Sequence, residues 1–150
     1  MEGNIIAAFT SPLDALDVKR YGYRLGDPAG QQTWESLALL VALRLWGPQW
    51  HQKRCHLHLR SDSIVALVLA SKLKAKGKHT NRIARGLAVD LGRGLYLPLV
   101  TQHTPGVSNV LPDALSRLNQ PGASSALPPA LSDVPLESVP SRGRDFYYFA

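Results

Sequence analysis

The feature that most constrains this chain is an apolar segment, TWESLALLVALRLW (Thr33 to Trp46), whose apolar residues occupy nearly every face of a helix. Thr33 can cap such a helix, Glu35 favours its first turn, and Gly47 followed by Pro48 ends it. A helix that is apolar on all sides is buried. Other elements therefore have to cover this helix on several sides.

Strand-like and helix-like segments alternate along the rest of the chain. The clearest strand is CHLHLR, in which Cys55, Leu57 and Leu59 alternate with polar residues, as in a half-exposed strand. In chain order we predict strand 5–9, helix 33–46, strand 55–60, helices 63–74 and 81–96, strand 97–103 and helix 112–118. This order is typical of an α/β domain.

The composition changes after residue 118. Hydrophobic residues make up 45% of the 150-residue chain, which is enough for one core. From Asn119 onward the sequence is dense in Pro, Ser and Ala and shows no sustained period. We therefore predict a domain over residues 1–118 and a disordered tail over residues 119–150.

The charge balance favours a polyanionic partner. Lys and Arg number 17 against 11 Asp and Glu, a formal net charge of +6, and nucleic acid is the commonest partner of such a chain. Between Asp62 and Asp90 there is no acidic residue, and the cations of this stretch form a predicted phosphate-contacting patch: Lys72, Lys74, Lys76, Lys78, Arg82 and Arg85. The alternatives, a solvated polar face and a charge that only keeps the chain soluble, stay open.

Cysteine content and hydropathy indicate the compartment. Cys55 is the single cysteine, so an intrachain disulfide is excluded. The N-terminal apolar run is too short for a signal peptide, and no later run is long enough for a transmembrane helix. We expect an intracellular chain, in the cytoplasm or nucleus, without a membrane partner.

Three carboxylates begin or interrupt apolar elements. Glu35 lies in the first turn of the apolar helix, Asp62 between a strand and a helix, and Asp113 at the start of the last helix. Strand ends and helix starts meet at one edge of an α/β sheet. Carboxylates gathered there repel one another unless a cation such as Mg²⁺ holds them. This pattern predicts a divalent-cation site.

Four motifs in this order resemble the ribonuclease H domain of retrotransposon reverse transcriptases. They are QQTWESLALLVALRLW, LHLRSDSIVAL, NRIARGLAVD and HTPGVSNVLPDALSRL. The last is the most specific, because it follows the pattern H-x-P-G-x-x-N-x-x-x-D-x-L-S-R, and it argues against an integrase-like core. The resemblance spans about Ile5 to Leu118.

The resemblance implies a ribonuclease H-like mixed sheet flanked by helices, and an endonuclease that hydrolyses the RNA strand of RNA–DNA hybrids. Such domains use two Mg²⁺ ions, with Mn²⁺ as an alternative, on four carboxylates, and they accompany a reverse transcriptase polymerase domain. Glu35, Asp62 and Asp113 match three of those metal-binding carboxylates. His103 matches the histidine that helps a proton or product leave, and Asn109 a position that orients nucleic acid.

The fourth carboxylate of the family has no match here. That aspartate lies in a first strand, and Ile5–Phe9 resembles the third strand, so we interpret the domain as N-terminally truncated. Asp14 and Asp17 follow this strand and are poor substitutes. We therefore expect weak or no nuclease activity. The alternative is a noncatalytic nucleic-acid-binding or structural remnant of a reverse transcriptase polyprotein.

Two further residue patterns have ordinary explanations. His51, His56 and His58 could suggest zinc, but no further ligands are near them in the sequence. Asp90 lies in the middle of a predicted helix, on a face that is largely polar, which favours a surface or ion-pairing role over a catalytic one.

Overall fold

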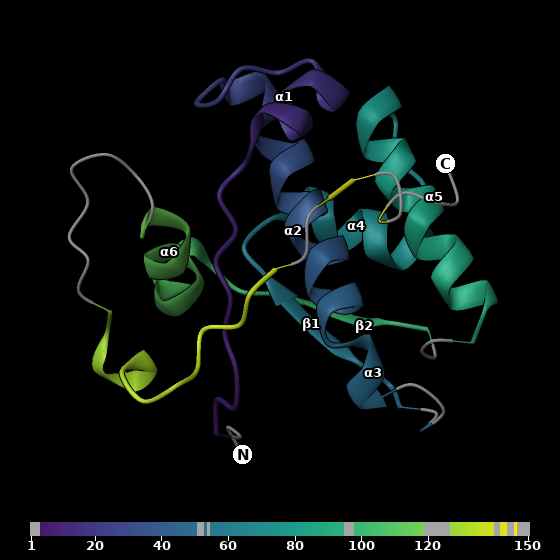
Figure 1. The fold of residues 1–150 in the computed structure, drawn as a ribbon. Coiled ribbons are helices and arrows are strands. Elements are labelled where there is room, and N and C mark those ends of the chain that lie inside the picture. Colours follow the sequence, from purple (N-terminus) through teal and green to yellow (C-terminus); the bar gives the residue numbers. More distant parts are fainter. Residues whose placement is uncertain are drawn as a thin grey trace.

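A computed structural model describes residues 4–50, 53, 55–94, 98–118, 127–139, 142–143 and 146. The chain has a mixed α/β fold with a two-stranded parallel sheet (Figure 1). The helices are α1 (Ala15–Tyr21), α2 (Gln31–Leu45), α3 (Gly47–Trp50), α4 (Ile64–Lys72), α5 (Lys78–Gly92) and α6 (Val110–Arg117). The strands are β1 (His58–Ser61) and β2 (Val100–His103). Three short 3₁₀ turns cover Pro28–Gly30, Gly106–Ser108 and Pro129–Leu131.

The sheet of the described residues is a single parallel pair. His58 is opposite Val100 and Ser61 opposite His103. Parallel strands need a long crossover connection, which α4 and α5 supply here. α4 packs against both strands, and α2 packs against α4 and α5. The α/β class is thus confirmed, and the order of these elements follows the sequence prediction.

The core forms around α2, as its apolar pattern predicts. Leu37, Leu40 and Val41 of α2 are buried against α4 and α5, which contribute Leu69 and Leu87 among others. Burying a side chain of this size stabilises a fold by about 1.5–3 kcal/mol. The apolar surface of α2 therefore holds the helical layer together.

α2 begins two residues before the predicted start. The 3₁₀ turn that precedes it is capped by Asp27, whose carboxylate accepts a hydrogen bond from the backbone N–H of Ala29 at 2.9 Å. This turn leads directly into the helix at Gln31, with Gly30 at the N-cap. Thr33 is therefore a buried residue inside the helix, and its predicted capping role is wrong.

Ser63 caps α4. Its hydroxyl accepts a hydrogen bond from the backbone N–H of Ala66 at 3.2 Å, at the point where β1 turns into the helix. The Ser63→Ala substitution removes this acceptor and is expected to lower the free energy of unfolding by about 1 kcal/mol. Urea denaturation measures the loss, and Ser63→Thr, which keeps a hydroxyl, is expected to recover most of it.

The N-terminal segment does not join the sheet as predicted. A strand was expected over Ile5–Phe9, but only Ala8 makes a bridge, and its partner is Leu136. The Ala8 N–H donates to the carbonyl of Pro135 at 3.2 Å, and the Glu137 N–H donates to the carbonyl of Ala8 at 2.8 Å. A partner from the C-terminal region thus satisfies the backbone groups that a sheet neighbour would have satisfied.

The described residues of the C-terminal region, 127–139, 142–143 and 146, form what we call the C-terminal strap. In Figure 1 the strap passes from the side of α6 across α2 toward α5. Leu131 and Arg142 are buried, and Glu137 accepts a hydrogen bond from the indole N–H of Trp46 at 2.9 Å. Leu131, Glu137 and Arg142 thus give the strap specific contacts with the rest of the fold, while the disordered tail predicted over residues 119–150 stays a prediction.

Asp90 is buried, although it was expected on a largely polar face. Its carboxylate accepts hydrogen bonds from Nε and Nη2 of Arg44 at 3.0 and 3.1 Å. Arg44 also donates to the carbonyl of Phe146 and lies 5.0 Å from the centre of that ring. The ion-pairing role of Asp90 is confirmed, and the pair joins α2, α5 and the strap.

Candidate functional site

Two of the predicted site residues lie at the same edge of the sheet. β1 ends at Ser61 and β2 ends at His103, and these two residues are paired in register. Asp62 follows Ser61 directly, and both Asp62 and His103 are exposed. The Thr104 N–H donates to the carbonyl of Ser61 at 2.8 Å, so strand-like pairing continues one residue past His103. The carboxyl edge of the parallel pair therefore presents a carboxylate and an imidazole to solvent.

The turn after β2 reaches the Asp62 carboxylate. Pro105 leads into the 3₁₀ turn Gly106–Ser108, and the Ser108 N–H donates to the Pro105 carbonyl at 2.8 Å. A Cβ atom placed on Gly106 would lie 3.8 Å from Oδ2 of Asp62. The His-Thr-Pro-Gly turn thus lies beside the carboxylate, and it carries the chain to the start of α6.

Asp113 and Asn109 mark the first turn of α6. Asn109 is the N-cap residue, and its carbonyl accepts a hydrogen bond from the Asp113 N–H at 3.2 Å. The Asp113 carboxylate is exposed and pairs with Nε of Arg117, one helical turn later, at 3.2 Å. An arginine of the same helix is therefore the ion-pair partner of this carboxylate.

Glu35 lies outside the first turn of α2, because the helix begins at Gln31. Its carboxylate is half-buried and accepts a hydrogen bond from Nε2 of Gln31 at 3.1 Å. The prediction that Glu35 belongs to the first helical turn is thus wrong, for the same reason as the predicted cap at Thr33.

The structure does not bring the three predicted metal ligands together. Glu35, Asp62 and Asp113 all lie within the described residues, where no group of three or more His, Cys, Asp or Glu side chains could hold a metal ion. The same finding covers His56 and His58, whereas His51 lies outside the described residues. The two-metal centre that the resemblance implies therefore stays a prediction.

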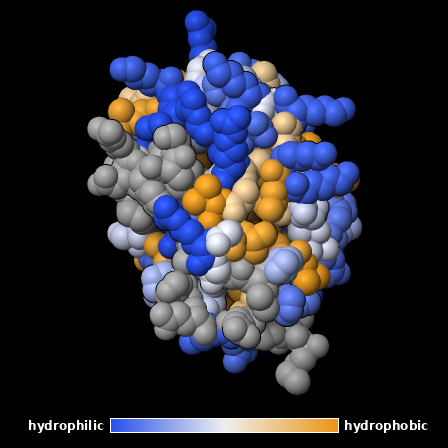
Figure 2. Space-filling model, turned by 90° about the vertical axis from the view of Figure 1, so that its right-hand side faces the viewer, coloured by the Kyte–Doolittle hydropathy of each residue, from blue (hydrophilic) through white to orange (hydrophobic). Residues whose placement is uncertain are grey.

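The predicted basic patch surrounds the connection between α4 and α5. Lys72 ends α4 and Lys78 begins α5, and these lysines are exposed together with Lys74, Lys76 and Arg85, while Arg82 is half-buried. Figure 2 looks at the side of the molecule where α5 lies, and hydrophilic residues gather over the upper part of that side. α4 has 9 residues and begins shortly after Asp62. With a rise of 1.5 Å per residue the helix is about 13 Å long, so the patch begins about 13 Å from the end of α4 that is nearer Asp62.

His79 lies within this basic stretch, and burial and the positive charges of the stretch affect its pKa. Burial lowers the pKa of His79, and the charges of Arg82 and Lys78 lower it further. Its ring packs edge-on against Tyr21 and Tyr23, with ring centres 5.9 and 5.6 Å away. His79 thus has a packing role next to the basic patch.

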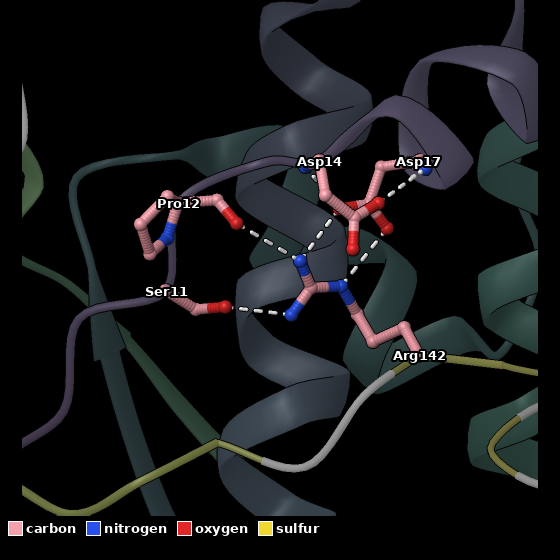
Figure 3. Close-up of polar contacts among 5 residues, drawn as sticks. All are labelled: Ser11, Pro12, Asp14, Asp17 and Arg142. Carbon is pink, nitrogen blue, oxygen red and sulfur yellow. Dashed lines mark hydrogen bonds and ion pairs between the residues drawn. The ribbon is translucent and has the colours of Figure 1, made fainter.

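Asp14 and Asp17 have structural roles at the start of α1. Asp14 caps α1, and the two carboxylates form a reciprocal capping box with the backbone N–H groups at 2.9 and 3.0 Å. Asp17 also pairs with Arg142 of the strap at 2.5 Å (Figure 3). No local sequence signal pointed to this pair, because its members are 125 positions apart.

The Asp17 pair predicts an acid-sensitive fold. Burial alone raises the pKa of Asp17, but hydrogen bonds from Arg142 and from the Asp14 backbone, together with the Arg142 charge, lower it below its usual value. Since the pKa is lower in the folded state, this stabilisation is complete above the unfolded pKa of about 3.9 and is lost as pH falls through the folded value. The free energy of unfolding, measured at a series of pH values from 6 downward, should therefore decrease once the pH is below about 4. This decrease should be less steep in Asp17→Asn.

No family model, curated protein or solved structure matches this chain. Among the described residues, no helix has both the length and the apolar character needed to cross a membrane.

Proposed function

We propose that this chain is a ribonuclease H-like domain of retroelement origin that binds RNA–DNA hybrids and cleaves their RNA strand weakly or not at all. The observation that carries the proposal is the carboxyl edge of the sheet. There Asp62 follows Ser61, the register partner of His103, and the His-Thr-Pro-Gly turn lies beside the Asp62 carboxylate. The four motifs in their family order supply the second line of support.

The chemistry proposed for this edge follows from its two exposed groups. Asp62 is the ligand for Mg²⁺ or Mn²⁺ that the resemblance assigns to the strand end, and His103 is the residue that the resemblance assigns to helping a proton or product leave. Glu35 and Asp113 are engaged by Gln31 and Arg117. Weak activity is expected, because the family's first aspartate has no match in this sequence.

A hybrid-cleavage assay tests the enzyme proposal. With Mg²⁺ or Mn²⁺ and an end-labelled RNA–DNA hybrid, we expect slow cleavage of the RNA strand by the wild-type chain. Asp62→Asn should remove cleavage, and His103→Ala should reduce it about 100-fold, the lower end of what general acid–base groups contribute. Asp133→Asn, which changes an exposed acid of the strap, is the control. Equal rates in wild type and Asp62→Asn would disprove the proposed site.

The exposed lysines between α4 and α5 favour a second candidate, a noncatalytic module that binds nucleic acid. Phosphate contacts by exposed lysines need no metal ion and weaken with salt. This candidate predicts hybrid binding that is unchanged by EDTA and by Asp62→Asn, with no cleavage by the wild type. Binding measured by fluorescence anisotropy with hybrid, duplex DNA and single-stranded RNA separates the two candidates and ranks their substrates.

A further inference from the structure

Arg142 joins the C-terminal strap to the N-terminal segment in the interior of the protein. Its side chain is 5% exposed and that of Asp17 is 1% exposed. Nε and Nη2 donate to the two carboxylate oxygens of Asp17 at 2.9 and 2.5 Å. Nη1 donates to the Ser11 hydroxyl at 2.6 Å and Nη2 also donates to the Pro12 carbonyl at 3.1 Å (Figure 3). One guanidinium group therefore holds the segment just before α1 in place.

The residue next to this anchor contacts α6. Thr10 precedes Ser11, and its hydroxyl donates to the carbonyl of Leu115 in α6 at 2.9 Å. Further along the segment, the Phe9 ring packs edge-on against Trp46, with centres 5.3 Å apart, and Ala8 pairs with the strap. Thr10 is therefore held on both sides while it contacts α6.

α6 depends on such contacts more than the other long helices do. None of its residues is buried, whereas α2, α4 and α5 each contribute several residues to the core. A helix with little buried apolar surface opens at low free-energy cost. The hydrogen bond from Thr10 to Leu115 is therefore a contact whose removal should be detectable in the opening of α6.

We propose that the C-terminal strap is a latch that positions α6, with Arg142 and Thr10 as positioning residues. The inference rests on the proposed function in one respect, namely that α6 carries Asn109 and Asp113 of the candidate site. Release of the strap frees residues 4–12, and α6 then loses its contact at Thr10. The core of α2, α4 and α5 stays folded in this step.

Amide hydrogen exchange of the full chain, read by mass spectrometry from milliseconds to minutes, tests the Thr10 contact first. Thr10→Val removes the hydroxyl at nearly constant volume. We expect the amides of α6 to exchange about fivefold faster, which corresponds to the loss of about 1 kcal/mol from one hydrogen bond, while the strap is unchanged. Thr10→Ser keeps the hydroxyl and should behave as the wild type. Unchanged exchange of α6 in Thr10→Val overturns the proposal.

The Arg142→Gln variant tests the latch itself. We expect exchange to rise together in the strap, in residues 4–12 and in α6, while the buried parts of α2 and α5 stay protected. Ser132→Ala, which changes an exposed strap residue with a local hydrogen bond to Pro129, is the matched control. A loosened strap beside an unchanged α6 overturns the proposal. If Arg142→Gln unfolds the whole chain, the Thr10→Val result decides. Because no nucleic acid is present, failure here is distinct from failure of hybrid binding.

Discussion

Replacing Arg142 by Gln is expected to lower the free energy of unfolding by about 3–5 kcal/mol, the range for removing one partner of a buried ion pair. The substitution leaves the Asp17 carboxylate buried without its counter-ion, and it removes donors to Ser11 and Pro12. An uncompensated buried charge costs more than the lost attraction alone, because the carboxylate stays removed from water. Urea denaturation at pH 7 measures the change.

A double variant and an exposed pair provide the controls for this expectation. Asp17→Asn combined with Arg142→Gln removes both charges, so it should be more stable than Arg142→Gln alone. Arg117→Gln breaks the exposed pair with Asp113 and should cost at most about 1 kcal/mol. A loss of less than 1 kcal/mol in Arg142→Gln would show that the strap adds little to the stability of the domain.

Neutralising the basic connection is expected to have the largest effect on function. The variant with Gln at positions 72, 74, 76 and 78 should bind an RNA–DNA hybrid about 100- to 1,000-fold more weakly at 0.1 M salt. Each phosphate contact releases about 0.9 of a counterion from a B-form duplex, and we take this value as a guide for the hybrid. Four contacts then correspond to a loss of up to about three orders of magnitude in binding affinity. The slope of log K against log salt should fall accordingly.

A charge-matched pair of variants separates local contact from net charge. Lys74→Gln with Lys76→Gln removes two charges from the patch, and Lys19→Gln with Lys53→Gln removes two exposed charges elsewhere. The first double variant should bind the hybrid at least tenfold more weakly than the second. Equal losses in the two variants would contradict a localised interface and leave only a general attraction of a chain with net charge +6.

The elements that local chemistry specifies were predicted well. The apolar pattern of α2 predicted its burial, and the helices after Ser61 and before Leu118 lie close to their expected ranges. Because Asp62 and His103 both lie where a strand ends and the two strands are parallel, these residues lie at the same edge of the sheet. Such features depend on residues within about one helical turn or on the alternation of a single strand.

The remaining carboxylates show why the site was only partly predictable. Asp113 lies in the first turn of α6, as expected, whereas Glu35 lies beyond the first turn of α2, and in both cases the position along the helix is a local feature. Whether several helix starts meet at one point depends on how the helices pack against the sheet. α6 has no buried residue, so hydrophobic burial does little to specify where Asp113 lies.

The sequence by itself determined the α/β order of the elements, the buried helix α2 and the position of Asp62 and His103 at the same edge of the sheet, because short-range periodicity and turn residues encode them. Tertiary structure alone decided the strap. Its Pro-, Ser- and Ala-rich composition predicts no regular structure, yet Arg142 and Asp17 meet in the interior from 125 positions apart. A buried guanidinium must find a carboxylate wherever the fold supplies one, and that partner is set by the arrangement of the whole chain in space.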